Sequence, residues 1–146
     1  MSADKSIDTP QVIATLDRIL ELELAGAVRY LHYSFMVFGH SRIPVCAWLR
    51  DQAQEGMTHA TAAGEHITSL GGHPSLAIGP LLETHKHDID QILGEAAEHE
   101  RGGLAQYHAL LDQVRDRSVM LEEYARKMIA SEENHLAEIA KMTRRA

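Results

Sequence analysis

Residues 121–142 read LEEYARKMIASEENHLAEIAKM, and this stretch decides the fold class. Its apolar residues recur at steps of three and four, which is the period of an α-helix with one buried face. Glu132 and His135 fall on that same face, between Met128 and Ile139. Two ionisable residues on the apolar side of a helix indicate a site inside the protein.

The same helical period runs through the rest of the chain, so we expect an all-α protein. A Thr9-Pro10 start and a Gly71-Gly72 end are typical helix boundaries, since proline fits a first turn and glycine a left-handed cap. Together these signals predict four helices, at about 9–38, 44–71, 81–114 and 118–143. Residues 72–80 are the longest irregular stretch and predict a long crossover between the second and third helices of a four-helix bundle.

The length, composition and net charge of the chain limit the number of domains and the kinds of partner that we expect. With 146 residues and 45% hydrophobic content, the chain is expected to form one domain at 9–146 after a flexible segment at 1–8. No apolar run is long enough to cross a bilayer and no secretion signal is evident, so we expect no membrane partner and a cytoplasmic protein. A net charge of −7 argues against nucleic acid as a partner.

On two further predicted helices, a glutamate occupies a position of the apolar face where a residue such as leucine is expected. Glu23 and Glu100 each interrupt an apolar face, and His59 lies on the apolar face of the second helix. Burying an unpaired carboxylate costs several kcal/mol, so inward glutamates on three helices need a common partner. A divalent cation serves best, because carboxylate oxygen and imidazole nitrogen suit iron, manganese or zinc.

Other polar and aromatic groups have plainer interpretations. Any single inward Glu or His can also be a satisfied core residue, and Tyr30 and Tyr107 are interpreted as ordinary core aromatics. A polar cluster at the start of the predicted third helix is interpreted as a solvated helix end, with a metal-entry site as the alternative; it comprises His85, His87, Asp88 and Asp90.

At these positions the sequence resembles the ferritin superfamily, most closely bacterioferritin. That family carries a Glu on its first and third helices and a Glu-x-x-His on its second and fourth. Glu23, Glu100 and the Glu132 to His135 segment match the pattern, and His59 matches the histidine of the second helix. The resemblance implies that these five residues hold a di-iron centre or another divalent metal pair.

The second helix departs from the family pattern. Gly56 stands three residues before His59, where the family has its bridging carboxylate. Glu55 is one residue earlier, about 100° around the helix, and is expected to reach the site only through a local bulge. Met57 takes the place of the methionine that binds haem between bacterioferritin subunits, although a methionine filling a gap at a helix interface is the alternative.

The resemblance implies oxidation of Fe(II) by dioxygen or peroxide, a ferroxidase activity weakened by the missing bridge, with possible iron storage in a homo-oligomer of at least two copies. Shell size stays open. The alternative is a degenerate member with a single or non-redox metal that acts as a structural or interaction protein. A rubrerythrin-like oxidase lacks its Cys-x-x-Cys iron site here, and a DNA-protecting mini-ferritin fits poorly with the negative charge.

Overall fold

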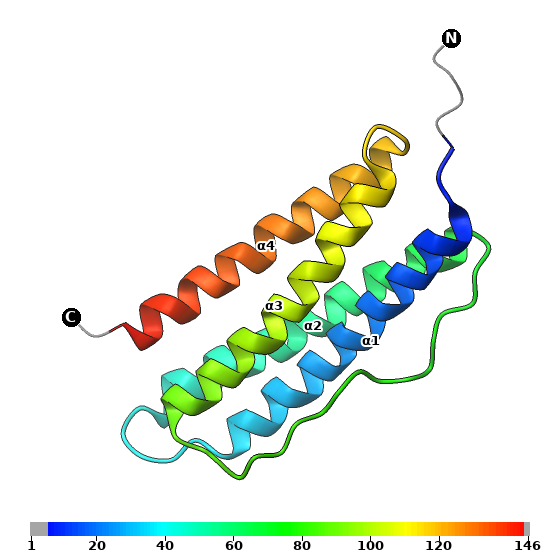
Figure 1. Cartoon of the computed structure of the whole chain (residues 1–146). Coiled ribbons are helices and arrows are strands. Elements are labelled where there is room, and N and C mark those ends of the chain that lie inside the picture. Colours follow the sequence, from blue (N-terminus) through cyan, green and yellow to red (C-terminus); the bar gives the residue numbers. More distant parts are fainter. Residues whose placement is uncertain (1–5, 145–146) are drawn as a thin grey trace.

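The computed structural model describes residues 6–144 and contains four long helices (Figure 1). They are α1 (Thr9–Phe35), α2 (Arg42–Ser69), α3 (Ile89–Val114) and α4 (Val119–Thr143). α1 packs against α2 and α3, and α3 packs against α4. The predicted all-α four-helix bundle is therefore confirmed. Residues 1–5 of the segment expected to be flexible lie outside the described part.

Local capping explains where the helices begin and end. Asp8, and not Thr9, caps α1 by accepting a hydrogen bond from the Gln11 amide at 3.2 Å. Ser118 caps α4 as predicted, accepting from the Leu121 amide at 3.3 Å. α2 ends before Gly71, whose φ of +83° is the left-handed conformation that glycine adopts without strain.

The third helix begins later than predicted. Residues 81–88 continue the crossover, and α3 starts at Ile89 behind an Asp88 cap that accepts from the Asp90 amide. A helix through this stretch is excluded by His85, which has a φ of +56°. The first helix is also shorter than predicted, ending at Phe35, and Phe38 lies outside it with its side chain exposed.

The crossover between α2 and α3 runs along the outside of α1, as the green segment of Figure 1 shows. The Ser75 amide donates to Asp17 at 2.9 Å, and the Gly79 amide donates to the Glu21 carbonyl at 2.9 Å. A Cβ on Gly79 would lie 2.9 Å from that carbonyl oxygen, so glycine permits this close approach. The crossover is thus fixed to α1 by its backbone.

Two apolar clusters make up the core. One includes Leu16 and Leu110, and the other includes Leu49 and Leu93; all four side chains are essentially inaccessible to solvent. The polar residues predicted to face inward lie at mid-helix, between the two clusters. No helix within the described residues is long and apolar enough to cross a membrane.

Candidate metal centre

All five residues predicted as ligands meet in the middle of the bundle. Glu23 comes from α1, His59 from α2, Glu100 from α3, and Glu132 and His135 from α4. Glu100 is 8% exposed and Glu132 is 2% exposed, so both carboxylates are removed from water. Helical spacing therefore identified the inward residues correctly on every helix.

The ligand atoms form two groups that share one residue. Glu23, His59 and Glu132 place one ligand atom each within 4.8 Å of one another, and Glu100, Glu132 and His135 do the same. His59 Nδ1 lies 2.9 Å from Glu23 Oε2 and 3.6 Å from Glu132 Oε1. Glu132 thus stands between two sets of donors, one on each side.

Two buried atoms in this site have no hydrogen-bond partner among the described residues: Glu132 Oε2 and His135 Nδ1. They lie 3.9 Å apart, which is too far for a hydrogen bond. An unsatisfied buried polar atom costs about 1–3 kcal/mol. A cation between these atoms would satisfy both, so the residues present fit a divalent metal.

Two small cavities adjoin these ligands. Each has a volume of about 10 Å³, close to the roughly 10–15 Å³ that one water-sized sphere needs. Glu23, Glu100 and Glu132 line both cavities, whereas His59 and His135 line one of them. The site therefore has space for ions and excludes larger ligands.

Burial shapes the protonation of the site. Desolvation raises the pKa of Glu100 to about 8, and its interaction with Glu132 adds to the rise. Burial alone lowers the pKa of His59, but its interactions with the nearby Glu132 and Glu23 carboxylates outweigh that effect and raise the pKa to about 10. Without a cation, protons balance the carboxylate charge, so a metal that binds here has to displace protons.

Tyr30 and Tyr107 do more than fill the core. The Tyr30 hydroxyl on α1 donates to Glu100 on α3 at 2.9 Å, and the Tyr107 hydroxyl on α3 donates to Glu23 on α1 at 2.8 Å. Each tyrosine follows a glutamate by seven residues, two helical turns, which places both on one face. Both tyrosines are core aromatics, as interpreted, and in addition hydrogen-bond to carboxylates of the site. The repeated seven-residue spacing was the available signal for this second role.

Glu55 lies at the outer edge of the site. Residues 42–69 form a continuous α-helix without a bulge, and Glu55 belongs to neither group of candidate ligand atoms, as expected for a helix without a bulge. Its carboxylate lies 3.1 Å from His135 Nε2 and 3.7 Å from His59 Nε2. Glu55 therefore contacts the histidines at their outer nitrogens, whereas their Nδ1 atoms face the buried glutamates. It can do so because it is 38% exposed and approaches from the solvent side.

Gly56 marks the close approach of α1 and α2. A Cβ at this position would lie 3.2 Å from the Glu23 carbonyl oxygen and 3.3 Å from Ala27 Cβ. Any side chain at position 56 would therefore require α1 and α2 to move apart by a few tenths of an ångström. Close packing of the two helices is our hypothesis for the absence of the family carboxylate.

His99 is a neighbour of the site that the sequence reasoning did not identify. Its Nδ1 lies 2.9 Å from Arg29 Nη1, and its Nε2 lies 2.9 Å from the Leu22 carbonyl oxygen. Arginine only donates, so Nδ1 accepts and Nε2 carries the proton. Burial lowers the pKa of His99, which agrees with this neutral form. With both nitrogens engaged by Arg29 and the Leu22 carbonyl, His99 has no free nitrogen to offer a metal.

Met57 lies away from the metal ligands, on the outer face of α2, and is 47% exposed. It lines an open groove of about 370 Å³ together with Val28 and Leu31, which are also partly exposed. Leu24, on the same helix as Val28 and Leu31, packs against the core. Haem at Met57 stays a prediction.

Comparisons with known proteins agree with this arrangement. A family model described as a ferritin-like domain matches residues 13–146. Bacterial non-heme ferritin from Escherichia coli O157:H7 is 27% identical over 92 residues, which cover 63% of this chain. Those residues are 56% of the relative, so the chain spans just over half the length of the curated relatives it matches.

Solved structures share the fold. A ferritin-like, diiron-carboxylate protein from Bacillus anthracis str. Ames superposes with a TM-score of 0.88 at 23% identity, covering 99% of this chain and 100% of that one. A dodecameric thioferritin from Bacteroides fragilis, described as bacterioferritin-related, gives 0.85 at 20% identity over 93% and 86% of the two chains. At these identities the likeness shows the fold alone.

Proposed function

The chain belongs to the ferritin-like domain family, and on that premise we propose that it binds two iron ions at the bundle centre and oxidises Fe(II) with dioxygen or peroxide. One observation carries the proposal: two groups of three ligand atoms share the buried carboxylate of Glu132. Two adjacent donor sets with one common carboxylate suit a pair of divalent ions better than a single one.

The protein's own residues divide the work. Glu23 with His59 would hold one ion and Glu100 with His135 the other, while Glu132 would link them. Tyr107 and Tyr30 each donate to a ligand carboxylate and fix its orientation. Bound iron would supply the electrons that reduce the oxidant.

Glu55 takes an outer position in this scheme. Its contacts with the Nε2 atoms of His59 and His135 favour the tautomer that carries hydrogen on Nε2 and leaves Nδ1 free to bind metal. The two imidazole rings are nearly parallel, 17° apart, so one carboxylate serves both. We propose that Glu55 orients both histidines and compensates in part for the carboxylate that Gly56 lacks.

Elemental analysis after anaerobic Fe(II) loading tests the proposal, with oxygen consumption followed on the same samples. We expect rapid oxygen uptake, and about two more irons per chain in the wild type than in Glu132→Ala, which should lose the oxygen uptake as well. Glu133→Ala is the matched control, because Glu133 is the neighbouring residue on α4 and is exposed. A difference of one iron between the wild type and Glu132→Ala, without oxygen uptake, would support the structural alternative with a single metal.

Assembly is a further part of the proposal. Val28, Leu31 and Met57 leave an apolar groove on the surface of the single chain, and a second copy of the chain would cover it. A similar protein of the same fold is a dodecamer. We propose a homo-oligomer of at least two copies, and sedimentation equilibrium of the wild type and Leu31→Glu would test it.

A further inference from the structure

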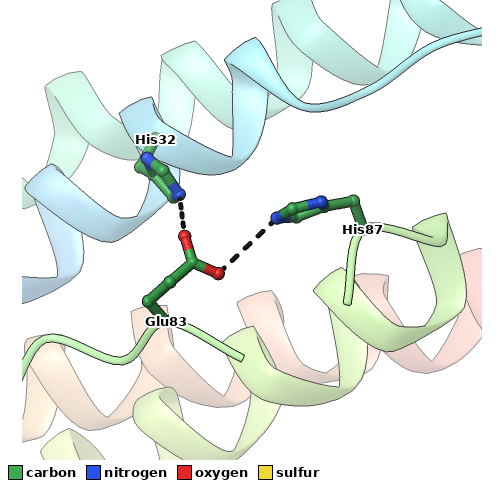
Figure 2. Close-up of side chains that lie close together, drawn as sticks. All are labelled: His32, Glu83 and His87. Atoms are coloured by element: carbon green, nitrogen blue, oxygen red, sulfur yellow. Dashed lines mark hydrogen bonds and ion pairs between the residues drawn. The ribbon is translucent and has the colours of Figure 1, made fainter. Parts of the chain in front are cut away.

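A second group of metal-binding side chains lies outside the bundle centre. His32 on α1 faces Glu83 and His87 of the crossover, as Figure 2 shows, and the three ligand atoms lie within 4.8 Å of one another. His32 Nε2 is 2.8 Å from Glu83 Oε2, and His87 Nε2 is 3.6 Å from Glu83 Oε1. Glu83 therefore stands between two imidazoles that come from segments far apart in the chain.

The backbone of the crossover brings Glu83 and His87 together. His85 lies between them with a φ of +56°, a left-handed conformation that reverses the chain direction locally. Its amide donates to Glu83 Oε1 at 2.5 Å and holds that carboxylate toward α1. The turn thus presents an oxygen and a nitrogen ligand to His32 on one side.

His87 carries the strongest sign of a missing partner. Its Nε2 is buried and has no hydrogen-bond partner among the described residues. The 3.6 Å to Glu83 Oε1 is beyond hydrogen-bond length. A buried nitrogen without a partner is unfavourable by about 1–3 kcal/mol, and a cation shared with Glu83 and His32 would remove that cost.

We propose that His32, Glu83 and His87 bind one divalent transition-metal ion, Zn²⁺ or Fe²⁺, which fastens the crossover to α1. Two imidazole nitrogens and one carboxylate oxygen form a donor set that both ions accept, with water at the open positions. In a tetrahedral site with bonds of about 2.1 Å, ligand atoms lie about 3.4 Å apart. The three atoms here lie within 4.8 Å of one another, so rotation of the partly exposed His32 and Glu83 side chains has to bring them closer when the ion binds.

This site is independent of the proposed function. It shares no residue with the bundle centre, and its ligands reach solvent, since the His32 and Glu83 side chains are 43% and 40% exposed. A metal here would join the crossover to α1 at a third point, after the backbone contacts of Ser75 and Gly79.

Equilibrium dialysis of the full-length protein against Zn²⁺, and separately against Fe²⁺ under anaerobic conditions, tests the proposal. We expect His87→Ala to bind one ion fewer per chain than the wild type, and Glu83→Gln to bind that ion at least about 100-fold more weakly. Glu132→Gln should lose metal from the bundle centre and keep this ion.

His73→Ala is the matched control, because His73 is an exposed histidine of the same crossover outside the cluster. It should bind as many ions as the wild type. Amide hydrogen exchange gives a second measure: Zn²⁺ should slow exchange at His85 in the wild type and not in His32→Ala. Equal metal content in the wild type, His87→Ala and Glu83→Gln, or no metal beyond that lost in Glu132→Gln, would overturn the proposal.

Discussion

Gly56→Ala tests whether close packing of α1 on α2 explains the missing carboxylate. The new Cβ would lie 3.2 Å from the Glu23 carbonyl oxygen, 3.3 Å from Ala27 Cβ and 3.4 Å from the Ala27 nitrogen. Two of these atoms belong to the backbone of α1 and cannot rotate away. The helices therefore have to separate by a few tenths of an ångström.

Two opposing terms set the size of the effect. Replacing a mid-helix glycine by alanine favours folding by about 0.5–1 kcal/mol. Overpacking a close helix contact costs about 1–3 kcal/mol. We expect Gly56→Ala to lower the free energy of unfolding by about 1 kcal/mol, and Gly56→Glu by more than about 3 kcal/mol because a charged chain would meet the α1 backbone.

Urea unfolding of metal-depleted protein measures both changes. Gly64→Ala is the matched control, since Gly64 lies on the same helix and a Cβ there would meet nothing within 4 Å. It should raise stability by about 0.5–1 kcal/mol. An equal gain in Gly56→Ala and Gly64→Ala would refute the packing argument. So would a Gly56→Glu protein that is as stable as the wild type and binds iron more tightly.

Three further variants test other contacts. Glu100→Gln should stabilise metal-depleted protein at about pH 9, because burial raises the pKa of Glu100 in the folded state from 4.5 to about 8. The stabilisation from protonated Glu100 is fully present below pH 4.5 and is lost as the pH rises through 8. The thermal unfolding temperatures of the variant and the wild type should therefore differ at about pH 9 and converge in acid. Tyr107→Phe removes the 2.8 Å hydrogen bond to Glu23 and should lower stability by about 1.5–3 kcal/mol in urea; unchanged stability and metal affinity would contradict its supporting role. Gly79→Ala should break the hydrogen bond that the Gly79 amide donates to the Glu21 carbonyl, and should therefore speed proteolysis of the crossover. A cleavage rate equal to that of the wild type would show that the close approach is dispensable.

The helical periodicity of the apolar residues was sufficient to predict the four-helix bundle and the polar residues at its centre. Each of the four helices is long and one-sided, so the position of Glu23 or Glu100 relative to apolar neighbours determines which way it faces. The relative positions of the four helices did not have to be known, because side chains that point inward from the middle of each helix all lie near the central axis of the bundle. Helical periodicity therefore placed the five candidate ligands on inward faces, and their role as metal ligands stays a prediction.

Contacts between distant segments were beyond this reasoning. Leu81 and Leu82 resemble the start of an apolar helix, yet they belong to a crossover whose path is set by α1. His32 and Glu83 are 51 residues apart, and no local pattern joins them. The third helix was predicted to begin at about residue 81, so His87 was placed within it and no contact of this segment with α1 was expected. The cluster of His85, His87, Asp88 and Asp90 does lie at the start of α3, and three of its four residues are exposed.

Gly56 has a packing role that the family pattern did not indicate. The absence of a side chain there permits the close approach of α1 to α2, and Glu23 lies 2.9 Å from His59 across this contact. The Glu55 carboxylate, one residue earlier, lies 3.1 Å from His135 Nε2 and 3.7 Å from His59 Nε2. The weakened site predicted from the missing carboxylate stays a prediction. Under the proposed function, Glu55 supports the histidines from outside, and a carboxylate at position 56 would require the two helices to separate.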